Sequence, residues 1–129
     1  GLVIAARDTS GSINRKQLAT FGNHIATMSY EIGCEVIVID IDDNIQQETR
    51  LQCGDTVPDA PAGGGTDFRP VFARAQELAD EGETIAGIVY LTDLEGPQPN
   101  ECEWPLLWVC ISHLKGICGS TINIEKEGW

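Results

Sequence analysis

Three short segments of this chain combine carboxylates and hydroxyls in patterns that could bind a metal ion. The first runs from Asp8 to Ser12 and carries one carboxylate and the hydroxyls of Ser10 and Ser12 at alternate positions. The second follows three consecutive glycines and contains Thr66, and the third ends in Asp93. Because alternate side chains of an extended segment project to the same side, Asp8, Ser10 and Ser12 are expected to point toward one place.

This donor set consists of oxygen atoms only. Asp8 and Asp93 would supply carboxylates, and the hydroxyls would come from Ser10, Ser12 and Thr66. Hard oxygen donors favour Mg²⁺, Mn²⁺ or Ca²⁺ over Zn²⁺. If the hydroxyls bind the ion directly and the carboxylates act mainly through water, the ion keeps much of its positive charge. It would then accept one further anionic ligand, such as an Asp or Glu carboxylate from a partner.

Apolar periodicity predicts an alternation of strands and helices that would bring the three segments together. Continuous apolar runs indicate buried strands, and an apolar face at helical spacing indicates amphipathic helices. The expected elements, in chain order, are a strand at 2–6, a helix at 13–32, strands at 36–39 and 45–53, a helix at 68–81, and strands at 85–92, 106–111 and 121–125. In such parallel sheets, ligands bind beyond the carboxyl ends of the strands.

The predicted fold class is therefore α/β, with three layers and a mostly parallel, twisted sheet. Residues 45–53 follow the polar turn at 42–44 and are expected to form its one antiparallel edge strand. The 129 residues, 42% of them apolar, suffice for one domain over 1–129. Because the chain begins with Gly1 rather than Met, we expect it to be excised from a longer protein.

Composition narrows the classes of partner. Eight basic and twenty acidic residues give a formal net charge of −12, which repels a phosphate backbone and argues against nucleic acid. The apolar runs are strand-sized, so no membrane segment is expected. The acidic balance suits a cation, or a basic or cation-bridged partner, although it is also common in soluble proteins.

The number and spacing of the cysteines indicate whether the protein is expected in a reducing or an oxidising compartment. There are five, an odd number without a C-x-x-C pair, at positions 34, 53, 102, 110 and 118. Buried free thiols in a reducing, cytoplasmic environment are the favoured interpretation over a disulfide framework. A zinc site is disfavoured because His24 and His113 are far apart and neither has a cysteine nearby in the sequence.

The segment from Asp8 to Ser12, together with Thr66 and Asp93, resembles the metal-ion-dependent adhesion site of the von Willebrand factor type A (VWA) fold. The order of the motifs and their places at strand ends match that family. A narrower resemblance, to a bacterial VWA-like domain found C-terminal to a predicted metallopeptidase domain, rests on residues 64–72, 90–93 and 107–108.

The resemblance covers nearly the whole chain and implies roles for individual residues. It implies direct coordination by Ser10 and Ser12, coordination by Thr66 directly or through water, and coordination by Asp8 and Asp93 largely through water. It also implies a Rossmann-like VWA topology, here reduced in helices between the last strands. One sheet face would then be thinly covered, which suits packing against a neighbouring domain.

Four further polar residues flank these predicted ligands, as a second shell or a rim. Asp42 ends the neighbouring strand, where it could orient a ligand or simply form the turn. Asp67 is expected to cap the second helix rather than to bind the ion. Arg69 would anchor the loop or hold an anionic ligand. Glu95 is expected to be solvated, with a contact to a partner as the alternative.

The sequence thus predicts a non-enzymatic protein-binding module whose ion accepts an acidic residue from a partner or a neighbouring domain. One alternative is an accessory or regulatory domain of a metal-dependent hydrolase or peptidase. A second is a structural module that the ion only makes rigid. Catalysis by this chain is disfavoured because it has no H-E-x-x-H motif and no histidine near the three segments.

Overall fold

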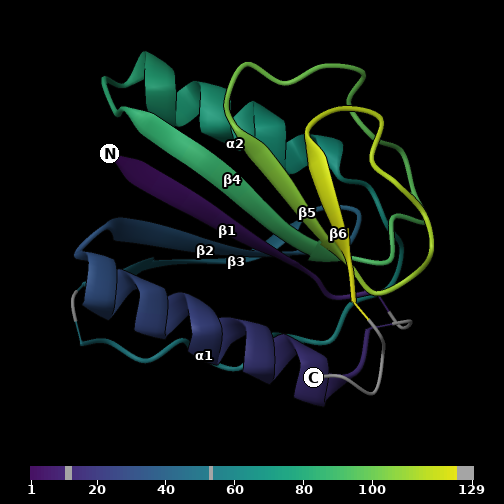
Figure 1. Cartoon of the computed structure of the whole chain (residues 1–129), viewed down its shortest axis with the longest axis horizontal. Coiled ribbons are helices and arrows are strands. Elements are labelled where there is room, and N and C mark those ends of the chain that lie inside the picture. The colour runs from purple at the N-terminus through teal and green to yellow at the C-terminus, as the bar shows by residue number, and fades with distance from the viewer. Residues whose placement is uncertain (11–12, 53, 125–129) are drawn as a thin grey trace.

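The order of strands and helices is the one that the sequence predicts (Figure 1). The computed structural model describes residues 1–10, 13–52 and 54–124. Its elements are β1 (Leu2–Asp8), α1 (Arg15–Ile32), β2 (Glu35–Ile41), β3 (Ile45–Leu51), α2 (Arg69–Asp80), β4 (Ile85–Thr92), β5 (Leu106–Cys110) and β6 (Ser120–Asn123). Of the expected strand ends, Cys53 and Glu125 lie outside the described residues.

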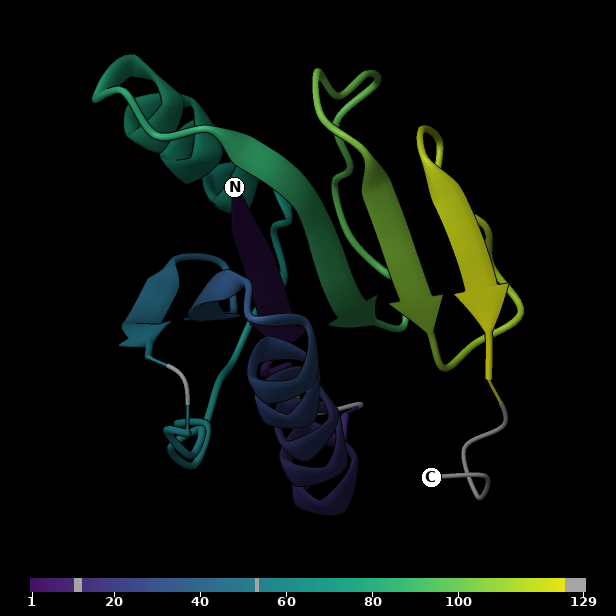
Figure 2. The same ribbon diagram turned by 60° about the vertical axis from the view of Figure 1, so that its left-hand side comes forward.

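The sheet has the strand order β3-β2-β1-β4-β5-β6. Strand β3 runs antiparallel to β2, and all other neighbouring pairs are parallel, as the sequence predicts. Figure 2 shows β4, β5 and β6 pointing the same way. Strand β1 lies between β2 and β4, and the strand order reverses there. After β1 the chain adds β2 and β3 on one side, and it then returns to add β4, β5 and β6 on the other. The carboxyl end of β1 is therefore the place where an open sheet of this kind forms a ligand crevice.

The two helices cover opposite faces of the sheet, which makes three layers (Figure 1). Helix α1 packs its Phe21 and Ile25 against one apolar cluster, and α2 packs Val71 and Leu78 against the other. Because side chains alternate along a strand, each inner strand contributes to both clusters. Trp108 is fully buried in the cluster under α2.

On the side of α1, the helix covers β1 and β2 and leaves β4 to β6 without a helical layer among the described residues (Figure 2). Leu107 and Val89 are only partly buried there, and Ile122 is 50% exposed. The expected loss of helices between the last strands is thus confirmed for the described residues.

Helix boundaries follow local capping chemistry. Helix α1 begins two residues later than predicted, because Asn14 and Gln17 form a capping box in which each side chain accepts from the other's backbone N–H. Gly33 ends it in the left-handed conformation, at φ 73°. Helix α2 begins at Arg69, with Phe68 in the N-cap position, and neither described helix is long and apolar enough to cross a bilayer.

The cysteines at 34, 102, 110 and 118 are free thiols, and Cys53 lies outside the described residues. Cys110 is buried, as expected, whereas the other three described cysteines are half-buried.

Candidate metal site

Asp8 is the last residue of β1 and is only 1% exposed. Its Oδ2 accepts a hydrogen bond of 2.7 Å from the Thr92 hydroxyl at the end of β4, and its Oδ1 accepts one of 2.9 Å from the Ser10 backbone N–H. Both carboxylate oxygens are thus fixed, one by a neighbouring strand and one by the turn that follows. Ser10 is also buried, and Ser12 lies outside the described residues.

Asp93 directly follows β4 and is 4% exposed. Its Oδ1 accepts from the Glu95 backbone N–H at 3.0 Å, and the Thr92 hydroxyl accepts from the Leu94 backbone N–H at the same distance. Leu94 has a φ of 64°, a conformation that is unfavourable for a residue with a side chain. The surrounding hydrogen bonds hold this strained turn in place, as is common at functional sites.

The glycine loop is tied to the end of β2 through Asp42. Oδ2 of Asp42 accepts from the Gly64 backbone N–H at 3.1 Å, and its carbonyl accepts from the Asp67 N–H at 3.0 Å. Hydrogen bonds to its carboxylate, foremost from the Asn44 backbone N–H and then from Gly64 and Gln46, lower the pKa of Asp42 to about 2. Asp42 therefore remains charged and acts as the anchor of the loop that carries the predicted ligand Thr66.

Thr66 is brought next to the segment that follows β4. A Cβ added to Gly96 would lie 2.7 Å from Cγ2 of Thr66, so the two residues are in close contact. Two residues after Thr66, the Phe68 N–H donates to the Pro97 carbonyl at 3.2 Å, which also holds this loop against the segment after β4. Thr66 thus lies at the edge of the sheet where β1 and β4 end.

The close approach of Gly63 to Thr9 gives a prediction. A Cβ at Gly63 would lie 2.5 Å from the Thr9 carbonyl oxygen, whereas one at Gly64 would meet only an Asp42 oxygen at 3.9 Å. Gly63→Ala should therefore displace the glycine loop and weaken Mg²⁺ binding, which calorimetric titration would measure, by about tenfold or more. Gly64→Ala is the matched control and should bind like the parent. Equal affinities in both variants would contradict this role of the loop.

The flanking residues have different environments. Asp67 does not occupy the N-cap position of α2 as predicted, because Phe68 intervenes. Its Oδ1 accepts from the Arg69 N–H at 3.0 Å, and its carboxylate pairs with the Arg69 guanidinium, which lowers the pKa of Asp67. Arg69 is thereby engaged with the start of α2, while its side chain stays 65% exposed. Glu95 is exposed, and the neighbouring Asp93 carboxylate raises its pKa.

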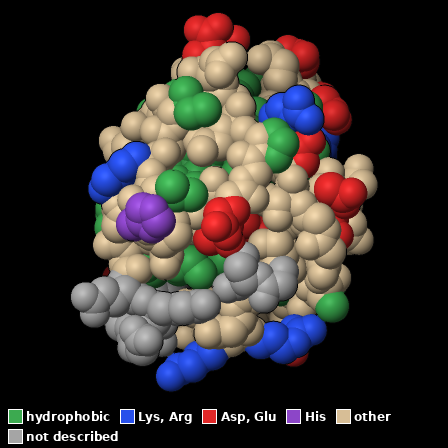
Figure 3. Space-filling model, turned by 90° about the vertical axis from the view of Figure 1, so that its right-hand side faces the viewer, with side chains coloured by type: hydrophobic (Ala, Val, Ile, Leu, Met, Phe, Trp, Pro, Cys, Tyr) green, Lys and Arg blue, Asp and Glu red, His purple; other side chains and the backbone are tan. Residues whose placement is uncertain are grey.

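Electrostatics at the carboxyl edge favour a cation. Burial raises the pKa of Asp8, hydrogen bonds from Thr92 and Ser10 oppose that shift, and the charge of Asp93 adds to it. A divalent ion would relieve both the burial cost and the repulsion between Asp8 and Asp93. On the face seen in Figure 3 the acidic side chains are scattered rather than gathered into one patch.

The donors proposed for this edge are oxygen atoms, without a thiolate or an imidazole. Within residues 1–10, 13–52 and 54–124, no three His, Cys, Asp or Glu side chains come together as a metal-binding group. The residues that the structure places at this edge are the carboxylates of Asp8 and Asp93 and the hydroxyl-bearing Ser10 and Thr66. Such a set fits a hard divalent ion bound through hydroxyls and water.

Sequence reasoning missed two hydroxyls that organise the site. Thr92 bridges Asp8 and the Leu94 turn, and Ser112, after β5, donates to the Asp93 carbonyl at 2.6 Å. The available signal for Thr92 was its position immediately before Asp93 at a strand end. Ser112 carried no comparable signal, since its role depends on where the chain after β5 returns.

Asp40 lies before the polar turn at 42–44 and is not part of it. It lies within β2, is fully buried, and forms a two-point ion pair with Arg7, with Nε–Oδ1 at 2.6 Å and Nη2–Oδ2 at 2.9 Å. Arg7 precedes Asp8 in β1, so alternation directs it to the α1 face of the sheet. Its Nη2 also donates to the Pro58 carbonyl at 2.9 Å.

Comparison with models of known families matches residues 2–122 to the one described as a VWA-like domain (DUF2201). This match spans most of the chain and agrees with the fold described above. A search of curated proteins found no match.

Proposed function

The chain belongs to the VWA-like domain family DUF2201, and on that premise we propose that it is a divalent-metal-dependent protein-binding module. The ion would be held at the carboxyl edge of the sheet and would accept an Asp or Glu carboxylate from a partner or a neighbouring domain. One observation carries this proposal: the buried Asp8 carboxylate is fixed by Thr92 and by the turn after β1, at the edge that Asp93 and Thr66 also reach.

The donor set fits Mg²⁺, with Mn²⁺ or Ca²⁺ as substitutes. Asp8, Ser10, Thr66 and Asp93 would hold the ion, together with Ser12, which lies outside the described residues. When bound, the ion supplies positive charge and an open coordination position for an anionic ligand. A carboxylate oxygen is the hard, charged ligand that such a position prefers.

The surrounding residues keep this arrangement in place before any partner arrives. Asp42 anchors the loop of Thr66, and Ser112 holds the backbone of Asp93. Exposed Glu95 and Arg69 lie where a partner would approach, on the segment after β4 and at the start of α2. Their opposite charges would favour partners that place a cation near Glu95 and an anion near Arg69.

No catalytic step is assigned to this chain, because the carboxylates that could transfer protons are the ones that would hold the ion. Any hydrolytic activity, including the peptidase association implied by the narrower resemblance, would belong to another domain or partner. The role of this domain would then be to join that component through the metal ion.

Two measurements on chelator-treated protein test the function. Calorimetric titration with Mg²⁺ is expected to show one site per chain. Retention on an immobilised panel of short peptides, each with one Glu or Asp, should require Mg²⁺ and disappear with EDTA. The same peptides with Gln or Asn are the control. Equal retention in EDTA would contradict the proposal, and a Mg²⁺-dependent rise in Tm without retention would favour a structural ion instead.

A further inference from the structure

The hydroxyl of Tyr90 stands out among the buried polar atoms. Tyr90 is fully buried in β4, and its hydroxyl is the one buried side-chain nitrogen or oxygen of the described residues without a hydrogen-bond partner. Such groups are rare in folded proteins, because each forfeits the hydrogen bonds that water would have made. An orphaned hydroxyl in an otherwise satisfied interior calls for a functional explanation.

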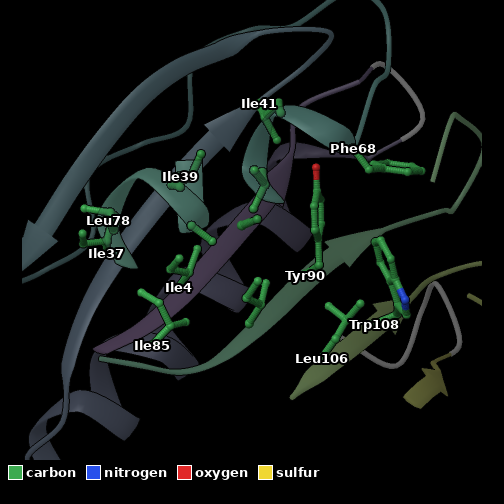
Figure 4. Packing of buried hydrophobic residues seen from close by; sticks show 14 of the residues in the cluster. Ile4, Ile37, Ile39, Ile41, Phe68, Leu78, Ile85, Tyr90, Leu106 and Trp108 are labelled. Carbon is green, nitrogen blue, oxygen red and sulfur yellow. The ribbon is translucent and has the colours of Figure 1, made fainter. Parts of the chain in front are cut away.

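The direction of the side chain is fixed by its aromatic neighbours. The Tyr90 ring lies 5.4 Å from the ring of Phe68, 6.3 Å from that of Phe72 and 5.1 Å from that of Trp108. Figure 4 shows its oxygen pointing toward the end of the sheet where Ile41 and Phe68 lie. This packing prevents the ring from turning the hydroxyl toward another partner.

The hydroxyl therefore points to the carboxyl edge, beneath the candidate metal site. In the sheet, Tyr90 is paired with Ala6, and two residues farther along each strand come Thr92 and Asp8 on the same face. The small side chain of Ala6 leaves room for the ring beside β1. Asp67 directly precedes Phe68, whose ring packs edge-on against that of Tyr90, so the Asp67 backbone is also held near this end of the ring. In agreement, burial raises the pKa of the Tyr90 hydroxyl, and the charges of Asp8 and Asp67 add to that shift.

We propose that Tyr90 is a positioning residue of the metal site, whose hydroxyl donates through one buried water to the carboxylates of Asp8 and Asp67. A water with one donor and two acceptors around it satisfies the usual requirement of two to four polar partners. The donated hydrogen bond would orient the Asp8 carboxylate toward the ion, as outer-shell partners commonly do.

This role rests on the proposed metal-binding function and extends it to the start of α2. Asp67 holds Arg69 on the surface, at 2.8 Å from Oδ2 to Nη2. A buried water between Asp8 and Asp67 would therefore connect the ion to the exposed guanidinium beside it.

The test is Tyr90→Phe, which removes only the hydroxyl, with Tyr30→Phe as the matched control because Tyr30 is 66% exposed on α1. Calorimetric titration with Mg²⁺ should show an affinity about tenfold lower for Tyr90→Phe, the low end of the range for outer-shell partners, and no change for Tyr30→Phe. Unchanged affinity in Tyr90→Phe, with the parent protein binding, would overturn the inference and leave the proposed function standing. A parent protein that binds no Mg²⁺ would overturn both.

A double-mutant cycle separates this role from a structural one. If Tyr90 acts through a water that Asp67 helps to hold, the loss of Mg²⁺ affinity caused by Tyr90→Phe should be clearly smaller in an Asp67→Ala background, which removes that acceptor. A general packing defect would instead lower affinity by the same factor in both backgrounds, and that result would overturn the shared water.

Discussion

Replacing Asp8 with Asn is expected to abolish Mg²⁺ binding and leave the domain folded. Asn keeps the shape, its one carbonyl oxygen can still accept from the Ser10 N–H, and its amide group can donate to the Thr92 hydroxyl, but it removes the charge that a divalent ion requires. We expect the affinity to fall more than about 100-fold, beyond the range typical of residues that act only through a ligand. Calorimetric titration of chelator-treated protein would measure this loss.

Although Asp8→Asn should lose Mg²⁺ affinity, its metal-free form should be at least as stable as the metal-free parent protein. Burial raises the pKa of Asp8, so its folded-state pKa lies above its unfolded value. Above the unfolded pKa the ionised Asp8 therefore costs stability in the metal-free protein, and Asn removes that cost. The metal-free Tm of Asp8→Asn should be equal to or higher than that of the parent, whereas the rise in Tm on adding Mg²⁺ should vanish.

Asp43→Asn is the matched control for Asp8→Asn. Asp43 lies in the exposed turn after β2, at the same edge of the sheet, and its substitution removes the same charge. It should retain Mg²⁺ affinity within a few fold, because exposed charges act weakly through water and salt. Asp8→Asn protein that binds Mg²⁺ as tightly as the control would rule out Asp8 as part of the site.

The second large effect is expected at the buried ion pair of Arg7 and Asp40. Asp40→Ala leaves the Arg7 guanidinium, whose side chain is 1% exposed, without its counter-charge inside the protein. Breaking a buried pair in this way typically destabilises a protein by about 3–5 kcal/mol. Urea unfolding of the metal-free protein, followed by circular dichroism, would measure the difference in the free energy of unfolding.

Two further variants make this test specific. Glu48→Ala removes a carboxylate that likewise accepts two hydrogen bonds from an arginine, Arg74. The side chains of that pair are 25% and 31% exposed, so its loss should lower the free energy of unfolding by no more than about 1 kcal/mol. Replacing both residues, Arg7→Met with Asp40→Leu, should recover much of the loss because no buried charge remains. If Asp40→Ala costs no more than Glu48→Ala, the buried pair has little role in stability.

Much of the fold could be predicted because its determinants are local. The apolar runs that became β2 and β4, and the spacing of Phe21 and Ile25 in α1, reflect which faces must be buried. Gly33 marks a helix end through its own backbone freedom. The helix starts were less accurate, because Asn14 and Phe68 took positions that the side-chain pattern had assigned to neighbouring residues.

The sequence by itself determined the predicted ligands, because Asp8 and Asp93 are hard donors at strand ends and Thr66 directly follows three glycines in the loop before α2. Only the tertiary structure decided how they are supported. The hydrogen bond from Thr92 to Asp8 joins residues 84 positions apart, and the pairing of Arg7 with Asp40 depends on the register of β1 against β2. The orphaned hydroxyl of Tyr90 depends likewise on how three aromatic rings pack. Such contacts arise from sheet register and packing, which periodicity along one chain does not specify.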